Sequence, residues 1–205
     1  MLWLALWLFV NSFFAQASTG LIAGCVTPEE AELVRLVNEY RVANGLQPVQ
    51  SSKRLSHTAQ WHLYDRIENP SAVGGICNTH SWSSNPPEGI SWIGMCYTSD
   101  HSQAAQMWAK PNQISAGRYV GNGYELAADT GGTQTAANAL LQWQNSPSHN
   151  AVILQQGVWA SVQFTGMGVA ILGPYAVLWF GDGNDPDGGS TACVSEIILQ
   201  SGFEQ

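Results

Sequence analysis

The segment that most restricts the fold is residues 175–180, Tyr-Ala-Val-Leu-Trp-Phe, which is apolar almost without interruption. A strand with one solvated face alternates polar and apolar side chains, whereas a strand covered on both faces is apolar throughout. Gly173-Pro174 predicts a hairpin turn between this strand and one over 159–172, and a third strand is expected over 119–127. We therefore expect helices on both faces of a small sheet.

Four segments have the apolar spacing or the caps of helices. In the clearest, Thr27 is the predicted N-cap, Pro28 fits the first helical position and Glu30 completes a capping box, and Gly45 marks the end. The other three helices are expected over residues 52–67, 99–110 and 133–143.

Two details of these helices bear on a site. His62 lies on the apolar stripe of the helix over 52–67, so we interpret it as a half-buried histidine with satisfied hydrogen bonds in preference to a ligand. The helix over 99–110 is expected to be capped by residues 99–101 and ended by Pro111. The stretch between them, residues 69–98, has no sustained period and predicts a long loop.

The N-terminus predicts export. Residues 1–17 combine an apolar run with a small-residue cleavage site, Ala15-Gln16-Ala17, and are interpreted as a signal peptide; the run is too short and interrupted to span a bilayer. An exported chain with four cysteines is expected to hold two disulfides. Of the three pairings we favour Cys77–Cys96, which closes a local loop, with Cys25–Cys193, which ties the two ends together.

A second interpretation of the N-terminus competes with the first. Ile22-Ala23-Gly24-Cys25 resembles a bacterial lipobox, whose cysteine becomes lipidated and anchors the protein to a membrane. Polar residues at positions 16, 18 and 19 count against it, and lipidation of Cys25 would leave Cys193 unpaired. We therefore favour an extracellular, periplasmic or cell-surface protein without an anchor at Cys25.

The charge distribution excludes some partners. The net charge is −8, and residues 119–205 contain seven carboxylates but no Lys or Arg. Nucleic acids and anionic membranes require clustered basic side chains, so neither is an expected partner. The acidic residues of segment 181–189 do not fit the alternating ligand positions of a calcium loop, because Pro186 occupies one of them, and we predict a flexible acidic turn.

No local catalytic motif is present, so a site must be assembled from residues distant in sequence. Six segments in order resemble the CAP family of cysteine-rich secretory proteins, antigen 5 and pathogenesis-related proteins, over residues 28–182. They are Leu36-Val37-Asn38-Glu39-Tyr40-Arg41 with Gly45-Leu46, Cys77-Asn78-Thr79-His80-Ser81-Trp82, Gly123-Tyr124-Glu125-Leu126-Ala127, residues 143–154 around Ser146-Pro147-Ser148-His149, and the closing segments 166–170 and 177–181.

The resemblance implies an α+β fold, a three-layer α-β-α sandwich with a small, mainly antiparallel central sheet. It also implies a cleft where His80 and His149 are metal ligands, sometimes for zinc, with Glu125 as a third ligand and candidate catalytic acid. The family's asparagine after this glutamate is Leu126 here, and residues 130–181 contain no Asp or Glu to supply its second acid. Candidates for that place are Gln142, Gln144 and Asn145.

The residue types support the same site independently. Two neutral imidazoles and one carboxylate form a sound zinc shell with an open position. The alternatives are a loop histidine bonded to backbone for His80 and a cap after the Pro147 turn for His149. His101 is a less favoured third histidine, because a cation at a helix N-terminus opposes the helix dipole.

These observations predict one globular domain over 28–182, after an N-terminal extension over 18–27 and before an acidic turn and tail over 183–205. Some members of the family it resembles bind sterols or fatty acids. We therefore expect a non-enzymatic domain that binds a lipid, another small apolar ligand or an extracellular protein. Two alternatives are a zinc-dependent hydrolase using His80, His149 and Glu125, and a structural surface module without a ligand site.

Overall fold

The computed structural model describes residues 24–193. The predicted signal peptide over residues 1–17 and the end of the predicted tail lie outside this range. The helices are α2 (Pro28–Ala43), α3 (Lys53–Glu68), α4 (Ala104–Trp108), α5 (Lys110–Ile114), α6 (Ala136–Asn145) and α7 (Pro147–Ile153), with short 3-10 turns at Pro70–Ala72 and Gly157–Trp159. The strands are β1 (Gly123–Asp129), β2 (Gly166–Leu172) and β3 (Tyr175–Gly181).

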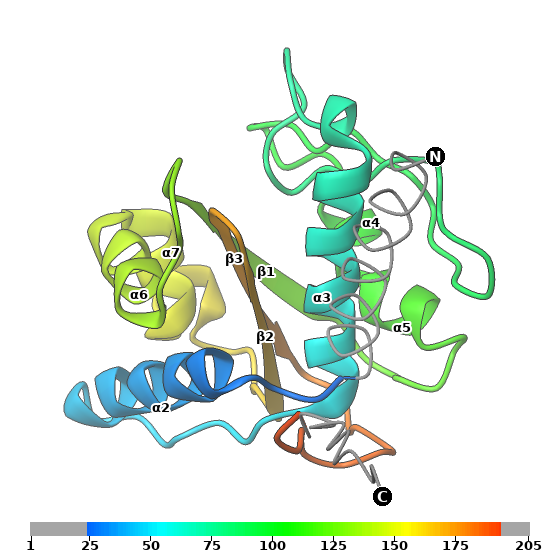
Figure 1. The fold of residues 1–205 in the computed structure, drawn as a ribbon. Coiled ribbons are helices and arrows are strands. Elements are labelled where there is room, and N and C mark those ends of the chain that lie inside the picture. Colours follow the sequence, from blue (N-terminus) through cyan, green and yellow to red (C-terminus); the bar gives the residue numbers. More distant parts are fainter. Residues whose placement is uncertain (1–23, 194–205) are drawn as a thin grey trace, which may run out of the picture.

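These strands form one antiparallel sheet in the order β1-β3-β2. Helices α2, α6 and α7 lie on one face, and α3, α4 and α5 lie on the other (Figure 1). The central strand β3 is buried from Ala176 to Gly181, as its apolar sequence predicts. The α+β, three-layer fold with a small antiparallel sheet is therefore confirmed.

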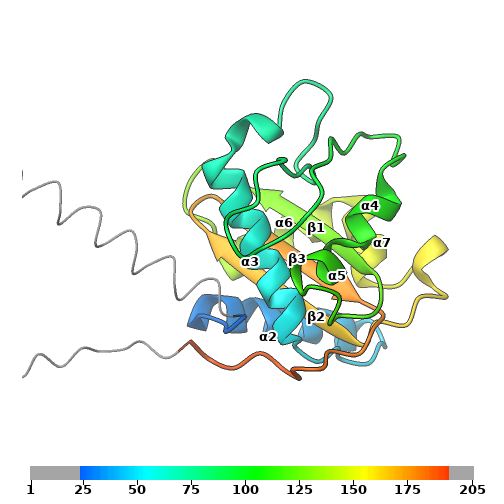
Figure 2. The same ribbon diagram turned by 90° about the vertical axis from the view of Figure 1, so that its right-hand side faces the viewer.

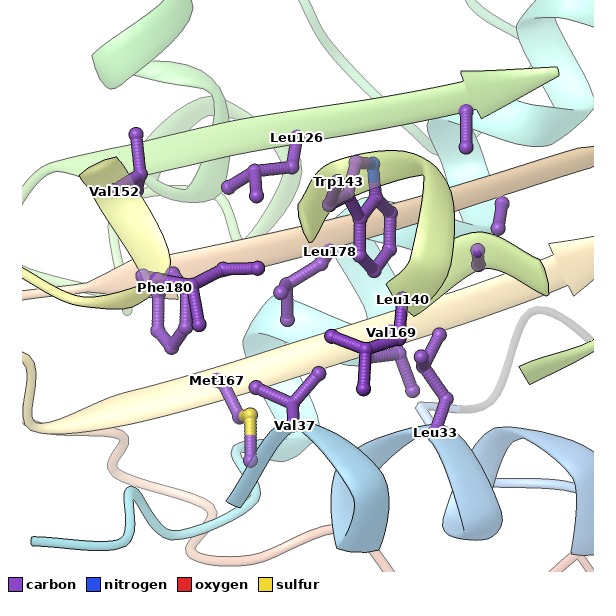
Figure 3. Close-up of a cluster of buried hydrophobic side chains, with 14 of the residues drawn as sticks. Leu33, Val37, Leu126, Leu140, Trp143, Val152, Met167, Val169, Leu178 and Phe180 are labelled. Carbon is purple, nitrogen blue, oxygen red and sulfur yellow. The ribbon is translucent and has the colours of Figure 1, made fainter. Parts of the chain in front are cut away.

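Alternation along the strands divides the core in two. Leu178 and Phe180 point to the face covered by α2 and α6, where they pack with Trp143 (Figure 3). Val177 and Trp179 point to the opposite face, toward α3 and the loop that follows it. Glu125 in β1 is paired with Trp179 in β3. Paired residues of neighbouring strands point to the same face of the sheet, so Glu125 shares the face of Trp179.

The capping box at the start of α2 is present as predicted, with Thr27 and Glu30 bonded reciprocally. Several predicted boundaries are wrong. Strand β1 begins at Gly123 and β2 at Gly166, later than the sequence suggested. Pro111 does not end a helix but lies in the first turn of α5, where its missing N–H costs nothing.

The segment after Pro147 is the main local correction. The sequence predicts a turn at Pro147, with a cap after it as the alternative to a ligand role for His149, but residues Pro147–Ile153 form helix α7. The proline again occupies the first turn, so it starts this helix and also ends α6. His149 therefore stands on a helix that can hold its ring in place.

The acidic turn over 181–189 is fixed in place, contrary to the expectation of flexibility. Asp185 accepts hydrogen bonds from the Ser52 hydroxyl at 2.6 Å and from the Arg54 amide at 2.7 Å, at the N-terminus of α3. Asp187 forms ion pairs with Arg54 and Arg118. These carboxylates cap a helix and neutralise two arginines, which accounts for their clustering without a metal.

Both predicted disulfides are confirmed, Cys25–Cys193 and Cys77–Cys96. The Cys25 sulfur is bonded to Cys193, so in this state it is not available for a lipid. Within residues 24–193, no helix is both long enough and apolar enough to cross a membrane. Two disulfides fit an exported protein, since such bonds persist in oxidising compartments.

We expect the double substitution Cys77→Ser, Cys96→Ser to lower the free energy of unfolding by about 3 kcal/mol, because the bond closes a short loop and restricts the unfolded chain. The sequence separation of 19 residues sets this magnitude. Urea denaturation followed by circular dichroism measures it. A change below about 0.5 kcal/mol would show that the loop is ordered without its clamp.

Candidate functional site

A cleft of about 610 Å³ opens at the β1 edge of the sheet, between α4 and α7. Figure 1 shows α4 and α7 on opposite sides of β1, and in Figure 2 both lie near one end of this strand. At one end the cleft is polar, with His80, His149 and Glu125. Apolar and aromatic side chains make up most of the rest, namely Met107, Trp108, Tyr124, Val152, Val158, Trp159 and Val162, and Asn78, Tyr97, His101, Ser148 and Gln156 also line it. Its volume lies in the range of about 300–1,000 Å³ that is typical of small-molecule sites.

Glu125 forms the centre of the polar end. Its side chain is fully buried, and its two carboxylate oxygens accept hydrogen bonds from different histidines: Oε1 from Nδ1 of His62 and Oε2 from Nδ1 of His80, the latter at 2.9 Å. Burial alone would raise the pKa of Glu125, but the two imidazoles outweigh it and lower that pKa to about 2. The group is therefore an ionised acceptor with both oxygens in use.

His62 belongs to the polar network of the site, although its position on an apolar helical stripe predicts only a structural role. It is completely buried, not half-buried, and its two nitrogens face acceptors: Nδ1 faces Glu125, and Nε2 lies 3.1 Å from the Ser81 carbonyl. A carbonyl only accepts, so with Glu125 ionised both nitrogens carry protons. The resulting imidazolium stacks on Trp82, with ring centroids 4.4 Å apart. It thereby neutralises Glu125 from the core side.

His80 is held from several directions. Its amide donates to the Asn78 side chain at 3.0 Å, and the Asn78 amide donates to the Tyr97 carbonyl across the Cys77–Cys96 clamp. The Tyr97 ring packs edge-to-face against the imidazole, with the ring centroids 5.3 Å apart. Since Nδ1 donates to Glu125, Nε2 lies on the opposite side of the ring.

His149 faces His80 from α7, with the ring centroids 6.2 Å apart. Burial, together with the neighbouring His80, lowers the pKa of His149 to about 4. Its imidazole is therefore neutral at pH 7. The structure thus brings His80, His149 and Glu125, which are remote in sequence, into one cleft.

His101 lies on the cleft wall and not in the hydrogen-bonded network. Its Nδ1 is 3.2 Å from the Tyr97 hydroxyl, and its backbone has a left-handed φ of 58°. The helix expected to start here begins later, at Ala104, with no side-chain cap. His101 therefore lines the cleft and contacts Tyr97, but within the described residues no hydrogen bond joins it to Glu125.

These donors match the requirements of a zinc ion only in part. Neutral imidazoles suit the ion, and a carboxylate behind His80 is the usual support for a metal-bound histidine. However, both Glu125 oxygens are occupied, and residues 24–193 contain no group of three or more His, Cys, Asp and Glu side chains arranged to hold a metal. The residues fit a two-imidazole contact and not the three-ligand shell of a catalytic zinc.

The layered fold and the cleft define a class of α+β domain with a histidine-lined cleft. The family model "CAP: Cysteine-rich secretory protein family" matches residues 34–180. This chain belongs to that family, as its sequence motifs suggested. No curated protein matches it.

Three bacterial proteins have solved structures with a similar fold. A cysteine-rich secretory protein from Staphylococcus aureus has 16% identity and a TM-score of 0.47, over 75% of this chain and 38% of its own. An outer surface protein from Borrelia burgdorferi has 16% identity and a TM-score of 0.48, over 78% and 96%. An extracellular protein containing an SCP domain from Bacillus anthracis has 19% identity and a TM-score of 0.48, over 75% and 40%. This chain therefore spans well under half of the first and third proteins.

Proposed function

We propose that this chain is an exported, non-enzymatic binding domain whose cleft takes a small apolar ligand. The observation that carries the proposal is the lining of the cleft. Its lining is mainly apolar and aromatic, and its one acid, Glu125, is withdrawn from the surface and bonded through both oxygens. Burying the apolar groups of a ligand against such a surface favours binding, and the few polar side chains orient the ligand.

The same geometry argues against hydrolysis. A general base must reach its substrate, and the Glu125 side chain is fully buried, with each of its oxygens accepting a hydrogen bond from a histidine. The second acid expected by resemblance to the family is missing from residues 130–181. The zinc-dependent hydrolase is therefore the weaker alternative.

Filling the cleft tests the proposal. Ala104 lines it, whereas Ala105, the next residue of α4, is exposed and outside the lining. We expect Ala104→Trp to weaken binding of 1-octanol at least tenfold, because the indole occupies the apolar volume, while Ala105→Trp leaves it unchanged. Isothermal titration calorimetry measures both. No octanol binding to the parent protein, or equal effects of the two variants, would reject the cleft as an apolar ligand site.

We also propose a weak zinc contact through His80 and His149, with Glu125 as the support for His80. Bound zinc would supply a Lewis acid at the polar end of the cleft. The double substitution His80→Ala, His149→Ala should remove zinc binding, whereas Glu125→Gln should weaken it by about 10- to 100-fold, as for a residue that orients a ligand. Calorimetric titration of folded variants measures this. Zinc affinity unchanged in the double variant would exclude the site.

A further inference from the structure

Three aromatic rings line the cleft away from its histidines, and each comes from a different element. Trp108 ends helix α4, Tyr124 lies in β1, and Trp159 ends the 3-10 turn Gly157–Trp159. The Trp108 and Tyr124 ring centroids are 5.9 Å apart with the planes inclined by 66°, and those of Tyr124 and Trp159 are 5.2 Å apart at 75°. These three residues, the aromatic wall, do not form a stack and can surround a compact group from more than one direction.

The rings of the aromatic wall are still available to a ligand. Trp108 and Trp159 are partly exposed. The cations that stand over aromatic rings within residues 24–193 lie elsewhere, over rings that do not line the cleft. The face of an aromatic ring carries partial negative charge, which attracts a cation most strongly when water is excluded. The aromatic wall therefore has the chemistry of a cation site and no cation of its own.

A carboxylate strengthens this preference. The Tyr124 hydroxyl donates to Asp182 at 2.7 Å, and the other donors to Asp182 are the backbone amide and the side chain of Asn122. Asp182 forms no ion pair with any described residue, so its negative charge is not neutralised and polarises the Tyr124 ring. Arg41 stands over the Phe164 ring, outside the cleft lining. In the part of the chain that the structure describes, no Lys or Arg lines the cleft.

From this geometry we infer that the aromatic wall binds a quaternary ammonium group, the trimethylated head of choline and of choline-bearing lipids. A primary ammonium group brings three N–H donors that need acceptors, and the mainly apolar lining offers few. A quaternary ammonium group has no N–H, and its methyl groups are apolar, so burial leaves no donor unpaired. This inference rests on the proposed function, since it names the group that the cleft of a binding domain takes.

Choline and 3,3-dimethyl-1-butanol test the inference, because they have the same shape and differ only in a charged nitrogen against a neutral carbon. Isothermal titration calorimetry of the parent protein should show choline binding about tenfold more tightly than the alcohol. This comparison needs no substitution, so it does not depend on the folding of a variant. Equal affinities of the two probes would overturn the inference and leave the apolar cleft standing.

Substitutions then locate the site. Trp159→Leu keeps an apolar side chain but removes the ring, and it should abolish most of the preference for choline. Tyr64→Leu is the matched control, because Tyr64 is a partly exposed aromatic residue outside the lining, and it should leave the preference unchanged. Asp182→Asn removes the negative charge without altering a ring, and should weaken choline about threefold and leave the alcohol unchanged. A preference for choline that survives both Trp159→Leu and Asp182→Asn would overturn the inference.

A further probe separates the two sources of the group. Dihexanoylphosphatidylcholine, below its critical micelle concentration, should bind more tightly than choline if the group comes from a lipid, and more weakly if it comes from a small solute. Binding of 1-octanol without any binding of choline would overturn the inference alone. Absence of binding by both 1-octanol and choline would instead defeat the proposed function itself.

Discussion

Gly168→Ala is expected to lower the free energy of unfolding by about 4 kcal/mol, an unusually large loss for the addition of one methyl group. Helix α3 crosses β2 at this residue. A Cβ built on Gly168 would lie 1.9 Å from the Ser56 amide nitrogen and 2.0 Å from the Leu55 carbonyl carbon. Both atoms are backbone, so no side-chain rotation relieves the clash, and the helix must move off the sheet.

Urea denaturation of the variant measures this loss. Gly132→Ala is the matched control, because a Cβ there meets no atom within 4 Å and its backbone is not left-handed. We expect the control to change stability by less than about 0.5 kcal/mol, as for most surface substitutions. A similar small effect of Gly168→Ala would mean that α3 and β2 do not pack as closely as described.

Glu125→Gln is expected to lower the free energy of unfolding by about 4 kcal/mol at pH 7, because it removes one partner of a buried ion pair. His62 would then be left without its counter-charge in a site with no solvent access. Glu39→Gln is the control, since it also removes an ion pair to a cation, Arg35, but at the surface. Exposed pairs contribute about 0–1 kcal/mol.

The same variant gives a pH dependence with a defined sign. The pKa of Glu125 is about 2 in the folded protein against an ordinary value of 4.5. A depressed carboxyl pKa contributes stability that is fully present above pH 4.5 and is lost as pH falls toward 2. The stability difference between the parent protein and Glu125→Gln should therefore shrink from pH 4.5 downward. A difference that stays constant over this range would contradict an ionised Glu125 in the network.

Local chemistry explains why some of the fold was predictable from sequence. The capping box at Thr27 and the apolar run of β3 depend on neighbouring residues and on side-chain period, so their structures followed directly. The starts of β1 and β2 and the role of Pro111 did not follow from sequence. A proline can follow the end of one helix or occupy the first turn of the next, and an extended segment can lie inside a strand or just before it. Tertiary pairing decided where each element begins.

The site was predictable only in part. Three of its residues, His80, His149 and Glu125, were identified through family-like motifs, and the structure places them in one cleft. His62 was missed because a histidine on an apolar helical stripe usually has a structural role, and nothing in the spacing links it to a residue 63 positions later. His62 is buried because helix α3 packs against the sheet, which the sequence around His62 does not encode.

The sequence by itself predicted the layered architecture and the export-type cysteine content through periodicity and composition, and it identified the cleft histidines through motifs that resemble those of the family. Only the tertiary structure decided the role of Glu125. A carboxylate is a ligand, a base or a buried acceptor according to what its two oxygens contact, and here both contact imidazoles that arrive from other elements. Such contacts arise from distant segments meeting in space, and no local pattern encodes them.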